Sequence, residues 1–261
     1  MAQAIRPTTD LSPRAVLTLV HRNTDVYLKT WKTNFLPPLL EPLLYVLALG
    51  YGVGAFIDEL EGVSYARFIA PGILAITMMQ SAFFETTYGS YIRMWFQKTW
   101  DALTATPLSL DDVIVGELVW AALKSTVNTL LMSLVLTALG LIPWWTVPLF
   151  LPLAFATGLV FGGIGMMFSA KVQHIDAFQF GIYLLVTPMM LFAGTYFPLD
   201  QMPAGAQAAA QVLPLTHAVA IARAVALGTD TQWALHLGYL AVAAVVFPAI
   251  SLSWMKKRLV V

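Results

Sequence analysis

The sequence contains no cysteine and few charged residues for its length. Of its 261 residues, 11% are charged and 59% are hydrophobic, whereas soluble domains are about 25% charged and about 45–50% apolar. The missing cysteines exclude disulfides, thiol catalysis and cysteine-based metal sites. Acidic and basic residues number 14 each, so the formal net charge is zero and nucleic acid is not expected as a partner. The composition predicts a polytopic membrane protein.

The motifs of soluble catalysis and nucleotide binding are also missing. The chain has no GxxxxGK[ST] phosphate-binding loop, no GxSxG nucleophile motif and no HExxH zinc motif. Its four histidines are scattered at His21, His174, His217 and His236, without paired carboxylates beside them. We therefore expect no catalytic residue and no bound metal or cofactor on this chain.

Six apolar stretches are long enough to cross a bilayer, which requires about 20 residues of α-helix. We predict an all-α polytopic membrane protein with one transmembrane domain over residues 35–258. Its spans cover approximately residues 35–57, 68–92, 113–142, 145–170, 177–197 and 233–255. Residues 1–34 hold no apolar run long enough for a cleavable signal peptide, and residues 1–11 show no pattern of regular structure.

An amphipathic helix is predicted over residues 12–34, directly before the first span. Ser12 is a suitable N-cap and Pro13 suits the first helical position. Val16, Val20 and Tyr27 fall on one face, and basic residues lie mostly on the other. We interpret this pattern as a helix lying in the membrane interface; the alternative is an ordinary surface helix.

The segment 198–232 is apolar enough to resemble a seventh span, but its sequence argues against one. Pro203 and Pro214 interrupt it, and glutamines together with Thr216 and His217 make it too polar to face lipid. We expect two short helices, at about 204–212 and 216–226, that enter the bilayer and return.

The distribution of positive charge predicts the orientation. With six spans and both termini inside, most Lys and Arg residues lie on the cytoplasmic side, as the positive-inside rule requires. They are eleven of the fourteen: Arg6, Arg14, Arg22, Lys29, Lys32, Arg93, Lys98, Lys171, Lys256, Lys257 and Arg258. A seventh span would place the last three on the opposite side.

Ionisable residues within the predicted spans are Glu41, Glu85 and Lys124. Each costs about 2.5–3.5 kcal/mol on insertion scales unless it finds a partner or water. Glu85 and Lys124 flank the same cytoplasmic loop at similar depth, so we expect them to pair. A structural ion pair is the favoured interpretation over a role in moving protons or substrate.

The loop between the second and third spans combines two helix signals. A short helix-compatible run containing Trp100 stops at Pro107, and Ser109 followed by Asp112 resembles a capping box that starts a new helix. A stiff helix–turn–helix in this position can pass force from outside the membrane into the third span.

Residues 84–117, from FETTYGSYIRMWFQKTWD to the glutamate of DDVIVGE, resemble the core motif of ABC-2 type export permeases. They are most similar to the nodulation-protein-J-type branch, the lipo-oligosaccharide exporter permeases. The resemblance implies a homodimer in the bacterial cytoplasmic membrane, bound to two copies of a separate ATPase that holds the ATP and Mg. Its cargo would be a lipid-linked oligosaccharide or a similar amphiphile.

The resemblance also implies roles for particular residues. The loop would be a coupling helix seated in the ATPase, with contacts from Trp95, Phe96, Lys98, Trp100, Asp101, Leu103, Thr106 and Pro107. A smaller second contact would come from Lys171, His174 and Asp176. Candidates to line the cargo path are Phe84, Tyr88 and the predicted kink at Pro188; the alternative is that the aromatics simply pack in the bundle.

Other functions fit parts of the sequence. An ion-gradient-driven secondary transporter would use Glu85 and Lys124 as a proton relay, although the chain shows no internal repeat of the kind many carriers have. An intramembrane enzyme would need clustered catalytic groups, and only the same two residues are available. An ABC-2 permease for a drug or a polymer would be the same machine with a different cargo.

Overall fold

The computed structural model describes residues 11–57 and 59–259, apart from the side chains of residues 33–38. The described residues form helices and no strand, with one isolated bridge between Leu60 and Val63. The predicted all-α class is confirmed. The prediction for the first eleven residues falls, except for Leu11, outside the described part of the chain.

Within the described residues, six helical segments are long and apolar enough to cross a membrane: Leu39–Phe56, Tyr65–Phe96, Leu110–Ala138, Trp144–Lys171, Ile175–Phe192 and Trp233–Leu259. The main helices in them are α2 (Trp31–Tyr45), α3 (Tyr65–Phe84), α5 (Leu110–Ala138), α6 (Val147–Lys171), α7 (Phe178–Gly181), α8 (Thr187–Phe192) and α11 (Trp233–Leu259). Wider π-helical turns extend α2 at Val46–Gly52, extend α3 at Glu85–Gly89 and Ile92–Phe96, and join α7 to α8 at Ile182–Val186.

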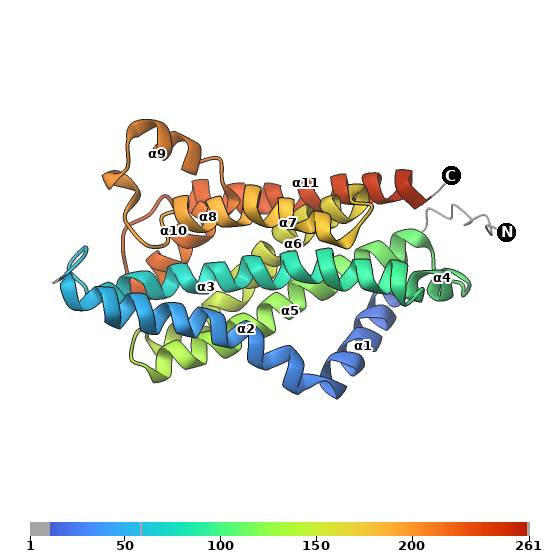
Figure 1. Ribbon diagram of the computed structural model, residues 1–261, viewed down its shortest axis with the longest axis horizontal. Helices are drawn as coiled ribbons and strands as arrows, with labels where there is room; N and C mark the ends of the chain where they lie inside the picture. The colour runs from blue at the N-terminus through green and yellow to red at the C-terminus, as the bar shows by residue number, and fades with distance from the viewer. Residues whose placement is uncertain (1–10, 58, 260–261) are drawn as a thin grey trace.

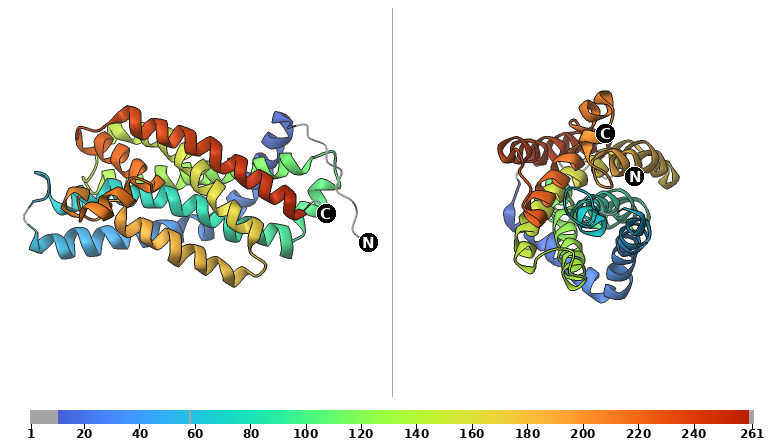
Figure 2. Two further views of the ribbon diagram at one scale, coloured as in Figure 1. Left: turned by 90° about the horizontal axis from the view of Figure 1, so that it is seen from above. Right: turned by 90° about the vertical axis from the view of Figure 1, so that its left-hand side faces the viewer.

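Shorter helices lie at both ends of this bundle. At one end are α1 (Pro13–Lys29) and α4 (Thr99–Thr104), and at the other are α9 (Ala204–Ala210) and α10 (Pro214–Leu227) (Figure 1). The described chain begins and ends at the α4 end, so its spans cross an even number of times (Figures 1 and 2).

The spans differ in how much of their surface the chain itself covers. In the second span, 83% of the apolar window is buried, compared with 17% in the first and 22% in each of the fifth and sixth. The second span can be central because α3 is apolar on all sides, and Phe68, Ile69 and Leu74 are fully buried. The faces of α2, α7–α8 and α11 remain open to lipid or to a second subunit.

Close packing of α5 on α6 depends on small residues. A side chain at Gly158 would place its Cβ 2.7 Å from the Cα of Ala122, which is too close for any residue but glycine. At Gly162 a Cβ would be 3.5 Å from the Cβ of Ala121. The spacing of four between these glycines therefore brings two helices of the same chain together.

The segment before the last span is a bent helix pair, as expected. α9 and α10 meet at 89°, and α10 packs on α3 and α11. Arg223 on α10 donates a hydrogen bond of 2.7 Å to the carbonyl of Gly194 and lies 4.0 Å above the ring of Phe68. The arginine thus serves a stretch of backbone outside any helix.

Two histidines join α10 to α11 at the same end. The Nδ1 atoms of His217 and His236 are 2.9 Å apart, and His217 Nε2 lies 2.9 Å from the carbonyl oxygen of Gln211. The His217 ring stacks on Tyr239 at 3.9 Å, and the Tyr239 hydroxyl donates to the carbonyl of Val212 at 2.7 Å. These contacts hold the turn between α9 and α10 against the last span.

Candidate functional site

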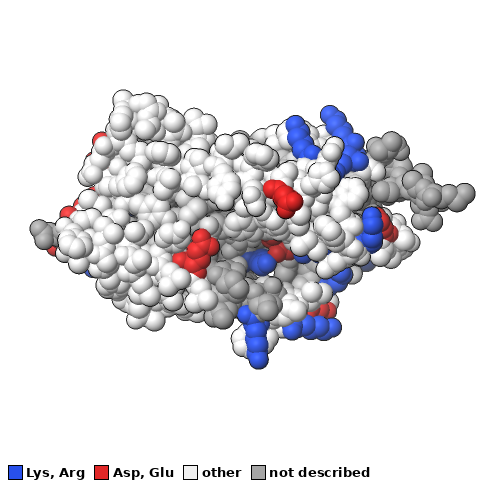
Figure 3. All heavy atoms as spheres, viewed as in Figure 1, with Lys and Arg blue, Asp and Glu red and all other residues white. Residues whose placement is uncertain are grey.

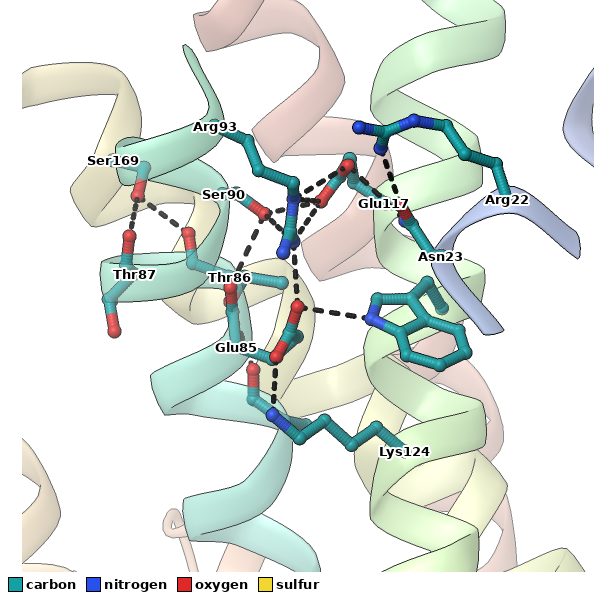
Figure 4. A network of polar contacts seen from close by, with 12 residues as sticks. Arg22, Asn23, Glu85, Thr86, Thr87, Ser90, Arg93, Glu117, Lys124 and Ser169 are labelled. Atoms are coloured by element: carbon teal, nitrogen blue, oxygen red, sulfur yellow. Dashed lines mark hydrogen bonds and ion pairs between the residues drawn. The ribbon is translucent and has the colours of Figure 1, made fainter. Parts of the chain in front are cut away.

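Near the α4 end, α3 and α5 enclose a cluster of four charged side chains, drawn in Figure 4. Glu85 and Arg93 lie on the π-helical turns that continue α3, and Glu117 and Lys124 lie on α5. Because the helix runs on to Phe96, Arg93 belongs to the span and not to the loop that its charge suggested. We refer to Glu85, Arg93, Glu117 and Lys124 as the charge cluster.

The expected ion pair is present within this cluster. Lys124 Nζ lies 2.6 Å from Glu85 Oε2, and an Arg93 terminal nitrogen lies 2.7 Å from Glu85 Oε1. Arg93 also forms an ion pair with Glu117, and its Nε is 3.1 Å from both Glu117 oxygens. The pair deduced from the sequence is thus half of a larger arrangement, in which Arg93 bridges the two glutamates.

The cluster is buried and its hydrogen-bonding capacity is used. The exposed fraction is 6% for the Glu85 side chain and 0% for Glu117. Trp120 Nε1 donates to Glu85 at 3.0 Å, and Ser90 Oγ donates to Glu117 at 2.8 Å. Two positive and two negative charges cancel, so removal of any single member leaves an uncompensated charge in the membrane.

Helix α1 packs onto α5 beside the charge cluster. Asn23 Nδ2 is 3.4 Å from Glu117 Oε1, and the Tyr27 hydroxyl donates to Asn128 Oδ1 at 3.3 Å. Burial, and secondarily the negative charge of Glu85, raise the pKa of Tyr27 to about 12, so the phenol remains a donor. α1 is therefore held by polar contacts to a span as well as by the interface.

The buried face of α1 is displaced from the predicted one. It is centred on Leu19, Asn23 and Tyr27, whereas Val16 and Val20 are only partly buried. The reason is Gly116 on α5, where an added Cβ would lie 2.8 Å from a Leu19 methyl. The gap left by this glycine admits Leu19 and sets the rotation of α1.

The start of α5 has the predicted capping box. The Asp112 backbone N–H donates to Ser109 Oγ at 3.0 Å, and the Ser109 N–H donates to Asp112 Oδ2 at 3.0 Å. The other oxygen of Asp112 accepts from the backbone N–H of Ser12 at 2.8 Å. Ser12 is the N-cap residue of α1, but contrary to expectation its side chain makes no capping bond.

Helix α4 corrects the role predicted for Trp100. This side chain is only 3% exposed and packs inside the bundle, and Leu103 is partly buried beside it. Neither can be a main contact to another protein; both fix α4 to the permease. The residues that α4 and its flanks do expose are Trp95, Phe96, Lys98, Asp101, Thr106 and Pro107.

The second predicted cytoplasmic contact lies at the same end. Lys171, His174 and Asp176 are all exposed. The hydroxyl of Tyr91, on the extension of α3, donates to the carbonyl of Gln173 at 2.6 Å. The loop after α6 is thus attached to the segment that leads into α4.

Two neighbouring cavities open beside α3. One, of about 220 Å³, is polar, with Phe84 as its only aromatic wall; it is lined by Glu41, Thr77, Gln80, Ser81, Phe84, Lys124 and Asn128. The other, of about 490 Å³, is mostly apolar and continues between α2 and α8. Glu41, Gln80 and Phe84 line both. Figure 3 shows a hollow on this face with charged side chains inside it.

Of the three residues predicted to line a path, the cavities include one. Phe84 lies in the walls of both. Tyr88 packs instead against Phe178, with ring centroids 5.2 Å apart. Pro188 lies in the first turn of α8, and the cavity is lined there by its neighbours Val186, Thr187 and Met190.

Comparison with known proteins identifies the family. Residues 14–227 match the family model described as ABC-2 type transporter. The chain belongs to this family. The nodulation protein J of Bradyrhizobium diazoefficiens is 38% identical over 91% of both chains, and that of Rhizobium leguminosarum bv. viciae is 35% identical over 93% of this chain and 94% of the relative.

A more distant relative is the inner membrane transport permease YadH of Escherichia coli, 23% identical over 91% of both chains. Permeases of the ABC-2 family are multi-pass transport subunits, and this chain has the corresponding six candidate spans among its described residues. The buried charge cluster therefore lies in a transport subunit and not in an enzyme.

Proposed function

We propose that this ABC-2 permease is one half of a homodimer that exports an amphiphile from the bacterial cytoplasmic membrane, driven by two copies of a separate ATPase. The observation that carries the proposal is α4: an exposed short helix on a buried aromatic base, joined within four residues to a capped transmembrane helix. The sequence itself has no phosphate-binding loop for ATP.

Force would enter through the exposed side of α4. Phe96, which is 67% exposed, Lys98 and Asp101 face outward, while Trp100 ties the helix to α5 and α1. The link over residues 105–108 ends at the Ser109 capping box, which fixes the start of α5. A displacement of α4 by the ATPase is then transferred to α5 and to the helices packed on it.

The two cavities support an amphiphilic cargo. Hydroxyl, amide and charged groups in the smaller cavity suit a hydroxyl-rich head group, and the adjoining cavity of about 490 Å³ suits an apolar chain. A lipid-linked oligosaccharide has both parts. A drug or a polymer would use the same machine, but a polymer without a lipid would have no use for the apolar cavity.

The α4 end is assigned to the cytoplasm. Figure 3 shows Lys and Arg gathered at this end of the visible face, as the positive-inside rule requires of cytoplasmic loops. Exposed tryptophans mark both ends of the spans: Trp31 and Trp95 at the α4 end, Trp144, Trp145 and Trp233 at the other. Both termini would then be cytoplasmic.

Co-purification with the candidate ATPase tests the proposal. We expect a complex with two copies of each chain, and we expect Phe96→Ala to lower its stability and its ATP turnover. Phe56→Ala is the matched control, because Phe56 is 91% exposed at the opposite end. Trp100→Ala should instead lower the thermal stability of the permease itself, by about 3–5 kcal/mol.

Loss of the complex in both phenylalanine variants, or in neither, would contradict the assignment of α4. Transport that persists without any ATPase would favour the ion-driven carrier. The cargo is tested separately by Gln80→Met, which removes the amide shared by both cavities. We expect it to reduce export of a lipid-linked oligosaccharide while the ATPase complex stays intact.

A further inference from the structure

A third cavity lies at the α4 end, between the ends of α6 and α11, away from the cargo cavities. It measures about 550 Å³ and is lined by Ala170, Lys171, Gln173, Trp254, Lys257 and Arg258. Three of these six side chains are cationic and none is acidic. We call it the basic groove.

The cations of the basic groove are not used up by ion pairs. Within the described part of the chain, Lys171, Lys257 and Arg258 have no carboxylate within 4.0 Å, whereas the adjacent Lys256 pairs with Asp111 at 2.9 Å. The last turns of α6 and α11 explain a cation at each helix end. They do not explain why three converge on one cavity without a counter-charge.

The aromatic side chains of the groove hold two of these cations in place. Lys171 Nζ lies 4.0 Å from the ring centroid of Trp254, and the Arg258 guanidinium lies 5.1 Å from that of Trp95. Arg258 also donates a hydrogen bond to the carbonyl of Ser169. Positioned cations beside a tryptophan at the end of a span are the composition of a membrane interface.

We propose that the basic groove binds the phosphate head group of an anionic phospholipid of the leaflet at the α4 end. A basic pocket between transmembrane helices at this depth attracts anionic lipid, because the surface potential and the local cations act together. The groove also offers apolar wall from Ala170 and Trp254 for the start of an acyl chain. This inference depends neither on the cargo nor on the ATPase.

A bound lipid would have a structural effect beyond occupancy. Its phosphate would bridge the ends of α6 and α11, which pack along their length. Through Arg258 and Trp95 it would also touch the turn that leads into α4. The proposal therefore connects lipid composition with the rigidity of the segment beside α4.

Native mass spectrometry of the full purified chain, titrated with phosphatidylglycerol, tests the proposal. We expect Lys257→Gln to weaken the tightest lipid adduct about fivefold, and the triple variant Lys171→Gln, Lys257→Gln, Arg258→Gln to weaken it by more than about tenfold. The matched control removes three exposed cations at the same end: Arg14→Gln, Lys29→Gln, Lys32→Gln. It should change binding less than twofold.

Three results would overturn the inference. Equal weakening in the control and groove triples would mean diffuse attraction, and no weakening in either groove variant would mean that lipid binds elsewhere. Displacement of the lipid by millimolar glycerol 3-phosphate would identify a soluble phosphate as the ligand. If the triple variant elutes as an aggregate, the single Lys257→Gln decides, since Lys257 is exposed at the helix surface.

An unchanged adduct combined with loss of the ATPase subunit would also overturn the lipid assignment. It would show that the groove receives an acidic protein surface. Phosphatidylcholine titrated in the same way measures the contribution of the acyl chains alone, and it should bind the wild type and the groove variants equally.

Discussion

At the α4 end of the bundle, four charged side chains neutralise one another, whereas at the α9 end an arginine and two histidines bind backbone carbonyls and each other. The difference follows from the backbone. α3 and α5 satisfy their own N–H and C=O groups, so Arg93 and Lys124 can be neutralised only by side chains. Around Gly194 and Gln211 the chain is irregular, and free carbonyls accept from Arg223 and approach His217.

The two ends should therefore respond differently to mutation. A charged side chain removed from the α4 end leaves its partner unneutralised, while a donor removed from the α9 end leaves only an unsatisfied carbonyl. The following experiments use the thermal stability of the purified permease in detergent to measure this difference, beginning with the largest expected effect.

The strongest test is Arg93→Met. It leaves Glu85 and Glu117 buried with one cation between them, and we expect a loss of about 3–5 kcal/mol, seen as a collapse of folded yield. Lys98→Met is the control, because this side chain is 59% exposed and only 3.9 Å from Asp101 in a solvated pair. Similar stability in the two variants would mean that Arg93 is not buried with its partners.

The second test compares single with double replacement of the ion pair. Glu85→Gln and Lys124→Met each leave a net buried charge and should cost about 3 kcal/mol. The double variant restores neutrality, because Arg93 keeps Glu117, and it should be more stable than either single variant. Simple addition of the two losses would show that the side chains do not interact.

At the α9 end, Arg223→Met should cost about 1.5–3 kcal/mol, less than Arg93→Met. The methionine can still pack on Phe68, so the measured loss reports mainly the hydrogen bond to Gly194. A loss as large as that of Arg93→Met would remove the proposed distinction between the two ends.

The smallest effect is expected for Tyr239→Phe. The ring keeps its stacking on His217, and only the hydrogen bond to the Val212 carbonyl is lost. Because that contact is exposed, we expect about 0.5–1.5 kcal/mol. The companion variant Tyr239→Leu also removes the ring, so a difference between the two measures the stacking.

Long-range hydropathy made most of this fold predictable from the sequence. Spans are specified by runs of about 20 apolar residues, and the capping box at Ser109 needs only two residues three positions apart. The bent pair was predictable from Pro203 and Pro214. The Glu85–Lys124 contact followed from equal depth on two spans that share a loop, which restricts the geometry strongly.

The missed features depend on packing that no local pattern contains. Arg93 was assigned to the loop because a charge usually ends an apolar window, yet the helix continues to Phe96. The six residues of α4 are too few to show which face is buried, so Trp100 could not be recognised as an internal anchor. The rotation of α1 depends on Gly116, almost a hundred positions away.

The π-helical turns of the second span have a geometric consequence for α4. Each wide turn accommodates about one residue more than an α-helical turn. Deleting one residue from Glu85–Gly89 would restore the ordinary pitch and rotate everything after it by about 100° around the span. Arg93 would leave Glu117, and Phe96 would point along a different bearing. The compass direction in which this subunit presents α4 is thus set by residue number within the membrane.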